Sequence, residues 1–218
     1  MFESKYGKVL TVILVIVIIA IIGLLGFLGY DFYQKYITEN DSSAFVDEFQ
    51  GEVAGTNNDG NTTAEDGNVN FDGVQNTEGA TKNGVKTYKG FVVMGTMEIP
   101  ATTFKYPVLE KVTKKSIETA VAVLYGAGIN QPGNTVIIGH NYRNGLFFSN
   151  NKKLNVGDKI YVTDNSGTKL TYTIYNKFET TPEDTSFYQR DTDGKAEITL
   201  STCTDDSSSR LIIEAKAE

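Results

Sequence analysis

The pattern of apolar and polar positions divides the chain into three stretches. In the first, residues 9–30 form an uninterrupted apolar run without a charge, in which Ile, Val and Leu dominate. As a helix, this run would span about 33 Å, enough for a hydrocarbon core of about 30 Å. A buried soluble helix would show a polar face, and a secretory signal peptide would have a shorter apolar core and a small-residue cleavage site. The run therefore predicts a membrane-spanning helix.

The charges that flank this run predict its orientation. Lys5 and Lys8 precede it, whereas Asp31, Glu39 and Asp41 follow it. Basic residues favour the cytoplasmic side of a membrane. We therefore expect a single-pass protein of the cell membrane with its N-terminus in the cytoplasm and its remaining part outside. Residues 1–37 would hold the cytoplasmic stub, the anchor and a juxtamembrane segment.

The second stretch, residues 38–84, is rich in Gly, Asn, Asp, Thr and Glu and has few apolar residues. It holds ten acidic residues against Lys82 alone, so its charge is -9, whereas the whole chain carries -7. Such a composition buries too little apolar surface to offset chain entropy and predicts a disordered linker. The acidity thus says nothing about partners of the folded part. Without a basic patch interleaved with aromatic residues, nucleic acid is not an expected partner.

The third stretch, residues 85–218, has short apolar runs separated by turn signals. Ile117, Val121 and Leu124 recur at helical spacing and predict a short helix over 115–125, and a second one is expected over 147–154. Seven or eight strands with little helix in a domain of this size predict an all-β fold, a closed or nearly closed β-barrel. The expected strands are 91–99, 104–109, 136–140, 159–162, 169–178, 197–203 and 210–215.

Candidate chemistry lies at the ends of three of these strands. His140 ends the run 136–140, Cys203 ends the run 197–203, and Arg210 begins the last run; the chain has no other cysteine or histidine. Each also has a structural explanation. His140 could be a satisfied core or surface histidine, Cys203 a small buried hydrophobe, and Arg210 an exposed charge at a strand edge. A thiol becomes nucleophilic beside a cation and a base, however, and antiparallel pairing would bring the guanidinium beside the thiol. Together they predict a cysteine-nucleophile acyl-transfer site.

The segment Thr199–Cys203, TLSTC, matches the TLxTC signature of sortases, the membrane-anchored cysteine transpeptidases of Gram-positive bacteria. His140 before it and Arg210 after it follow that family's chain order, and the anchor and linker fit its layout. The chain therefore resembles a sortase over about residues 90–215. Two further segments resemble the family's opening strands and mid-domain strand entry: residues 95–107 and 155–160.

This resemblance implies a sortase-type β-barrel over residues 85–218, with a substrate groove that ends at the cysteine. Cys203 would attack the carbonyl after the threonine of an LPxTG-like sorting signal and form an acyl-enzyme. His140 would protonate the leaving amine and then deprotonate an incoming amine. Arg210 would hold the substrate backbone or the tetrahedral oxyanion.

The resemblance also implies the partners and binding residues. Thr202 would contact the bound peptide, together with Ser201, and the loop 179–195 would cover the groove and read the signal. The partners would be the sorting signals of secreted surface proteins and an amine from a peptidoglycan precursor or a pilin. No metal and no cofactor is expected.

Two questions stay open at this point. The 63 positions between His140 and Cys203 are close to the compact subclasses, such as class D, whereas the LSTCT ending with a short loop to Arg210 is similar to class B. The alternative function is a membrane-tethered, non-enzymatic β-barrel binding module at the cell surface. Such a module would leave the joint placement of thiol and imidazole unexplained, and its thiol would react like an ordinary or buried one.

Overall fold

The computed structural model describes residues 5–56 and 85–218. The chain falls into two compact units, one ending at Thr38 and the other running from Glu39 to Glu218. Helix α1 (Lys5–Thr56) contributes to both units.

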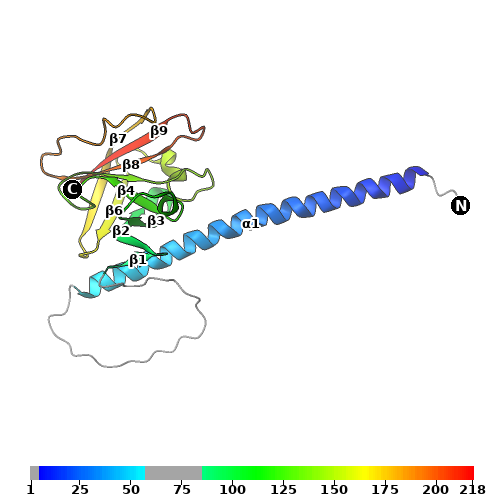
Figure 1. Ribbon diagram of the computed structural model, residues 1–218, viewed down its shortest axis with the longest axis horizontal. Coiled ribbons are helices and arrows are strands. Elements are labelled where there is room, and N and C mark those ends of the chain that lie inside the picture. The colour runs from blue at the N-terminus through cyan, green and yellow to red at the C-terminus, as the bar shows by residue number, and fades with distance from the viewer. Residues whose placement is uncertain (1–4, 57–84) are drawn as a thin grey trace, which may run out of the picture. The chain divides into compact units, whose positions relative to one another are not determined.

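The first unit contains the apolar part of α1 (Figure 1, blue). Its large apolar side chains are exposed all round the helix, with Leu10 at 69% and Phe27 at 70% exposure. By length and composition, the helical segment 7–54 is the one candidate for a membrane span within the described part of the chain. An apolar surface of this kind is favourable in lipid and costly in water.

The second unit begins with the last 18 residues of α1, about five turns, which corrects the expected linker. Residues 39–56 are helical, and Phe45, Phe49 and Val53 are at most 5% exposed. These side chains recur at intervals of four, on one face of the helix. They pack against buried residues of the barrel and of the segments next to it: Tyr88, Val93, Leu109, Ala120 and Ala122. The predicted disorder of 38–84 is therefore wrong for this part, and the rest, 57–84, lies outside the described residues.

Polar contacts accompany this packing. The Gln50 side-chain amide donates to Glu98 Oε1 across 2.8 Å, and Lys86 Nζ lies 2.8 Å from Glu52 Oε2. The Lys86 ammonium also lies 4.3 Å from the centroid of the Phe49 ring. The helix is thus joined to the barrel by an apolar face flanked by polar contacts.

The strands of the second unit form one sheet that closes on itself. The sheet order is β1-β2-β3-β4-β5-β8-β9-β7-β6, and β6 pairs back with β2. The closure leaves β1 outside and makes an eight-stranded barrel of the described strands β2 to β9, which confirms the expected all-β barrel. The strands are β1 (Thr87–Tyr88), β2 (Phe91–Ile99), β3 (Phe104–Leu109), β4 (Val121–Tyr125), β5 (Gly133–Ile138), β6 (Lys159–Asp164), β7 (Lys169–Thr180), β8 (Ala196–Cys203) and β9 (Arg210–Ala217).

The helices of the barrel region are short: η1 (Pro100–Thr102), α2 (Lys114–Ile117) and η2 (Phe148–Lys153). The helix expected over 115–125 is wrong in its second half, because α2 ends after one turn and β4 follows. The β4 residues Val121 and Val123 are β-branched and fit a strand between two neighbours. Val121 pairs with β3 and Val123 with β5.

The pairing of the last strands places the candidate chemistry at one edge of the barrel. β5 runs parallel to β8, with Ile138 opposite Ser201. Parallel strands end at the same edge of a sheet, so the residues that follow β5 lie near the end of β8. β9 runs antiparallel to β8 and begins where β8 ends.

Candidate active site

The thiol and the guanidinium lie side by side on paired strands. Cys203, the last residue of β8, is directly opposite Arg210, the first residue of β9. Arg210 Nη1 donates to Cys203 Sγ across 3.2 Å. The guanidinium therefore directly contacts the sulfur of the chain's one cysteine.

His140 follows β5 and is half-buried. Its ring lies 4.9 Å from the Tyr142 ring, centroid to centroid, with the two planes tilted by 33°. Burial lowers the pKa of His140 below its usual 6.5, and the Glu118 carboxylate acts in the opposite direction. The neutral imidazole is therefore favoured, and it is the form that accepts a proton.

One cavity of about 320 Å³ brings the five sequence-predicted site residues together. Its lining includes His140, Ser201, Thr202, Cys203 and Arg210. It also includes apolar and aromatic residues: Ile117, Leu124, Ile138, Phe187 and Tyr188. A cavity with such a mixed lining can bind apolar side chains of a peptide next to the thiol.

Thr202 and Gly139 connect β8 to the backbone just before His140. The Thr202 hydroxyl donates to Gly139 O across 2.7 Å, and Thr202 is only 4% exposed. A Cβ on Gly139 would lie 2.7 Å from Val121 Cγ1 and 2.9 Å from Phe148 Cδ2, so a larger residue would displace its neighbours. The hydroxyl thus has a structural bond in addition to any contact that it makes with a peptide.

Asn141 is a site residue that the sequence reasoning missed. Its side-chain amide donates to Cys203 O and to Asp205 Oδ1, each across 3.0 Å. Lys152 Nζ donates to Asp205 Oδ2 across 2.6 Å, and these two donors, Lys152 first, lower the pKa of Asp205. The chain segments on both sides of the thiol are therefore tied together. The signal in the sequence was a polar amide directly after the histidine.

The loop between β7 and β8 supplies a wall of the cavity. Phe187 and Tyr188 line it, with Pro182 and Asp184 from the same loop. The resemblance predicted that residues 179–195 cover a groove, and the structure places part of this loop at the cavity. Which peptide the loop reads remains a prediction.

Among residues 5–56 and 85–218, no group of three or more His, Cys, Asp or Glu residues could hold a metal ion.

Comparison with known proteins assigns the family. Residues 97–218, more than half of the chain, match the sortase domain family. The chain belongs to the sortase family. The sortase domain is 33% identical over 124 residues to Sortase A of Bacillus anthracis, an alignment that covers 56% of this chain and 58% of that protein. The match thus spans less than two thirds of this relative's length.

Solved structures agree with this assignment. Sortase A from Corynebacterium diphtheriae superposes with a TM-score of 0.54 at 28% identity, over 59% of this chain and 61% of that chain. A Clostridium perfringens Sortase D5 transpeptidase superposes with a TM-score of 0.53 at 29% identity, over 58% of this chain and 79% of that chain. These relatives carry the names of two subclasses, so the subclass of this sortase stays open.

Proposed function

We propose that this sortase is a membrane-anchored cysteine transpeptidase that cleaves LPxTG-like sorting signals after Thr and transfers the protein to an amine. The observation that carries the proposal is the contact of 3.2 Å between Arg210 Nη1 and Cys203 Sγ in a cavity that His140 also lines. Cys203 and His140 are the only cysteine and histidine of the chain. Their joint placement in one cavity is what acyl transfer requires and what a binding module does not need.

In the first half-reaction, Cys203 acts as the nucleophile. Its thiolate forms a C–S bond to the threonine carbonyl carbon, and the electron pair of the C=O bond moves to the oxygen. When the tetrahedral intermediate collapses, the C–N bond breaks and the leaving amine takes a proton from the His140 imidazolium. The imidazolium is the less populated form of this buried histidine, and it carries the proton that His140 accepted from the incoming amine of the previous turnover. The product is a thioester on Cys203 and a free amine.

In the second half-reaction, an incoming amine attacks the thioester carbon. Neutral His140 accepts the proton of this amine, the C–S bond breaks, and a new amide is released with Cys203 as thiolate again. The lowered pKa of His140 favours the neutral, proton-accepting form that this step needs. The first half-reaction thus leaves His140 neutral, as the second one requires, and the second leaves it protonated, as the first one requires.

Arg210 stabilises the charge that develops in both half-reactions. The negative charge forms on the oxygen of the carbon that is bonded to Sγ, so it arises close to the atom that Arg210 Nη1 already contacts. A guanidinium stays charged at all relevant pH values and donates in a fixed planar fork. The proposed role of Arg210 is therefore that of an oxyanion donor.

The proposed substrate is supported by the apolar residues of the cavity and by the family, and the proposed acceptor is supported by the family alone. Leu124, Ile138 and Phe187 give the cavity an apolar wall that suits the Leu and Pro side chains of such a signal, with Ser201 and Thr202 contacting the peptide. The acceptor is proposed to be an amine of a peptidoglycan precursor or of a pilin. The charges flanking the apolar run support a cytoplasmic N-terminus and an extracellular catalytic domain.

The test is a cleavage and transfer assay on the full chain in detergent. A panel of LPxTG-type peptides is incubated with and without an amine acceptor, and the products are identified by mass spectrometry. We expect cleavage after Thr, a new amide bond that depends on the acceptor, and loss of both in the folded Cys203→Ala variant. Binding without cleavage by the wild-type protein would instead support the surface binding module, and undiminished cleavage by Cys203→Ala would refute the nucleophile.

A further inference from the structure

The loop wall of the cavity has no regular secondary structure of its own. Residues 181–195 connect β7 to β8 without a helix or strand, and they carry Phe187 and Tyr188 into the cavity. Phe187 is 6% exposed and packs against Val136 of β5 and Ile212 of β9. Apolar packing of one ring does not fix a backbone, so other contacts must hold this turn in place.

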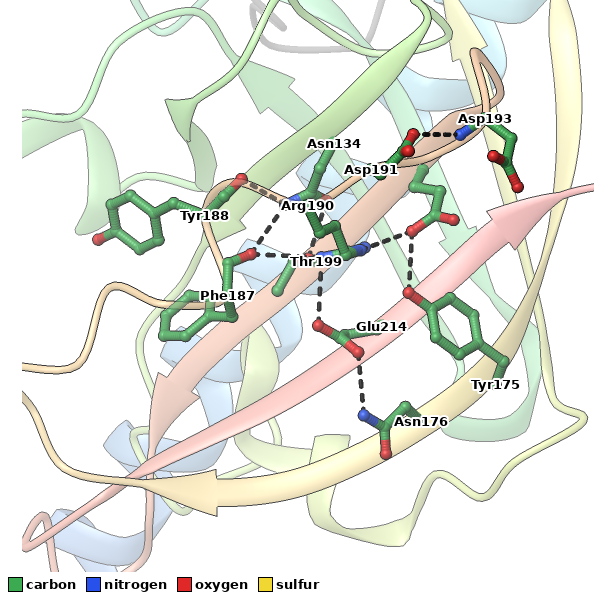
Figure 2. Close-up of polar contacts among 11 residues, drawn as sticks. Asn134, Tyr175, Asn176, Phe187, Tyr188, Arg190, Asp191, Asp193, Thr199 and Glu214 are labelled. Atoms are coloured by element: carbon green, nitrogen blue, oxygen red, sulfur yellow. Dashed lines mark hydrogen bonds and ion pairs between the residues drawn. The ribbon is translucent and has the colours of Figure 1, made fainter.

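Arg190, in the same loop, folds back onto the barrel and makes four of these contacts (Figure 2). Its Nε donates to Glu197 Oε2 across 2.6 Å, and its Nη1 lies 3.2 Å from Glu214 Oε1. The same Nη1 donates to Thr199 Oγ1 across 2.8 Å and to the carbonyl of Phe187 across 3.3 Å. One guanidinium thus joins the Phe187 backbone to strands β8 and β9.

Asn134 of β5 also holds the same turn. Its side-chain amide donates to the carbonyls of Phe187 and Tyr188, each across 3.0 Å. Its own oxygen accepts a hydrogen bond of 2.9 Å from the Thr199 hydroxyl, so it belongs to the same network (Figure 2). Asn134 is 7% exposed, and a buried amide that makes three such bonds has little freedom to rotate.

The carboxylates of the network are poorly exposed and have further donors. The side chains of Glu197 and Glu214 are 11% and 10% exposed, and that of Arg190 is 18% exposed. The Tyr175 hydroxyl donates to Glu197 Oε2, and the Asn176 amide donates to Glu214 Oε2, each across 2.9 Å. Buried ion pairs with such second donors hold a defined geometry, because any displacement leaves a desolvated charge unpaired.

We propose that Arg190 and Asn134 are positioning residues that fix the Phe187–Tyr188 turn in the cavity wall and thereby set the affinity for the peptide substrate. The network uses the same two strands as the reacting groups: β8 carries both Thr199 and Cys203. The position of the turn relative to the Cys203 thiol is therefore fixed through β8. The identity of the peptide rests on the proposed function, whereas the fixing of the turn does not.

The test uses the full chain in detergent and two variants that disrupt the contacts of Asn134 or Arg190 with the Phe187–Tyr188 turn. Asn134→Asp keeps the shape but replaces the donor by an acceptor. Arg190→Met is combined with Glu197→Gln and Glu214→Gln, because the single variant would leave buried carboxylates unpaired and could unfold. Tyr175→Phe is the matched control: it removes a bond to the same network but none to the turn.

Two readouts separate positioning from a general structural role. For peptide acylation, we expect both designs to raise KM by about tenfold with kcat within about threefold, as for the loss of a buried hydrogen bond. Hydrogen exchange of residues 181–189 should accelerate by about tenfold or more as the turn opens locally. The reaction of Cys203 with iodoacetamide should stay within about twofold, because its own contacts are intact.

Unchanged KM in both designs, or unchanged exchange in both, would overturn the proposal, as would an equal effect in Tyr175→Phe. If the wild-type protein acylates none of the peptides, the proposed function fails. The exchange measurement then still decides whether Arg190 and Asn134 fix the turn.

Discussion

The C-terminal part of α1 should be necessary for the stability of the barrel unit, and Phe49→Ala tests this most sharply. Phe49 is 1% exposed in the cluster that joins the helix to the barrel, and the Lys86 ammonium lies 4.3 Å from its ring centroid. Truncation of a buried Phe costs about 3–5 kcal/mol, and a cation–π contact contributes about 0.5–1 kcal/mol. We expect a loss of about 4 kcal/mol, which lowers Tm by roughly 10 °C in a unit of this size.

The assay is thermal and urea unfolding of residues 39–218, the compact unit, followed by circular dichroism. Glu48→Ala is the matched control, because Glu48 is exposed on the same helix and its truncation should change stability by less than about 0.5 kcal/mol. A chain that begins at Val85 should be destabilised more than the Phe49→Ala variant, since it loses Phe45 and Val53 as well. If Phe49→Ala unfolds within about 1 kcal/mol of the wild type, residues 39–56 do not pack on the barrel as described.

Three further predictions concern the site. Arg210→Ala should lower kcat for acylation by about 10²–10³-fold, and Arg210→Lys by less, without a change in thermal unfolding. The single histidine resonance in NMR should titrate below pH 6.5, because burial lowers the pKa of His140. Below pH 6.5 the unfolded chain then binds more protons at this group than the folded one does. The contribution of His140 to the free energy of unfolding is therefore complete above pH 6.5 and is lost as pH falls through the folded pKa. His140→Gln should remove this part of the pH dependence of stability. Asn141→Ala should slow acylation by about tenfold, measured in single turnover, because the backbone at Cys203 loses its tie to the loop.

The barrel and the meeting of Cys203 with Arg210 could be predicted from the sequence. The apolar runs are short, and their ends coincide with the reactive side chains. Two runs joined by a short polar loop pair as a hairpin, so the last residue of one faces the first residue of the next. The parallel pairing of β5 with β8, which places His140 near the end of β8, was not predicted. The sequence analysis placed His140 in the site by the family resemblance and not by strand pairing.

Two elements could not be predicted from composition. Residues 39–56 have few apolar side chains, but Phe45, Phe49 and Val53 recur at intervals of four and so form one helical face. The average composition of residues 38–84 does not contain this spacing, so the composition alone predicted disorder. Conversely, Ile117, Val121 and Leu124 fit a helical period by chance, and the pairing of β4 with both neighbours outweighs it.

The network around Arg190 was not predictable for a different reason. It joins Arg190 to Asn134, Thr199 and Glu214, residues on three strands and a loop whose mutual distances depend on the closed barrel. No local pattern identifies such partners, because each of these polar residues taken alone fits a solvated position.

The central claim, that Cys203 forms an acyl-enzyme with a sorting signal, has one direct test. The full chain is mixed with a molar excess of LPxTG-type peptide without an amine acceptor, quenched in acid, and analysed by intact mass and by peptide mapping. The claim predicts a mass increase equal to the free-acid peptide that ends at its Thr, less one water. The adduct should lie on the proteolytic fragment that contains Cys203 and should be removed by hydroxylamine. Cleaved peptide without any such adduct, or an adduct on another residue, would contradict it.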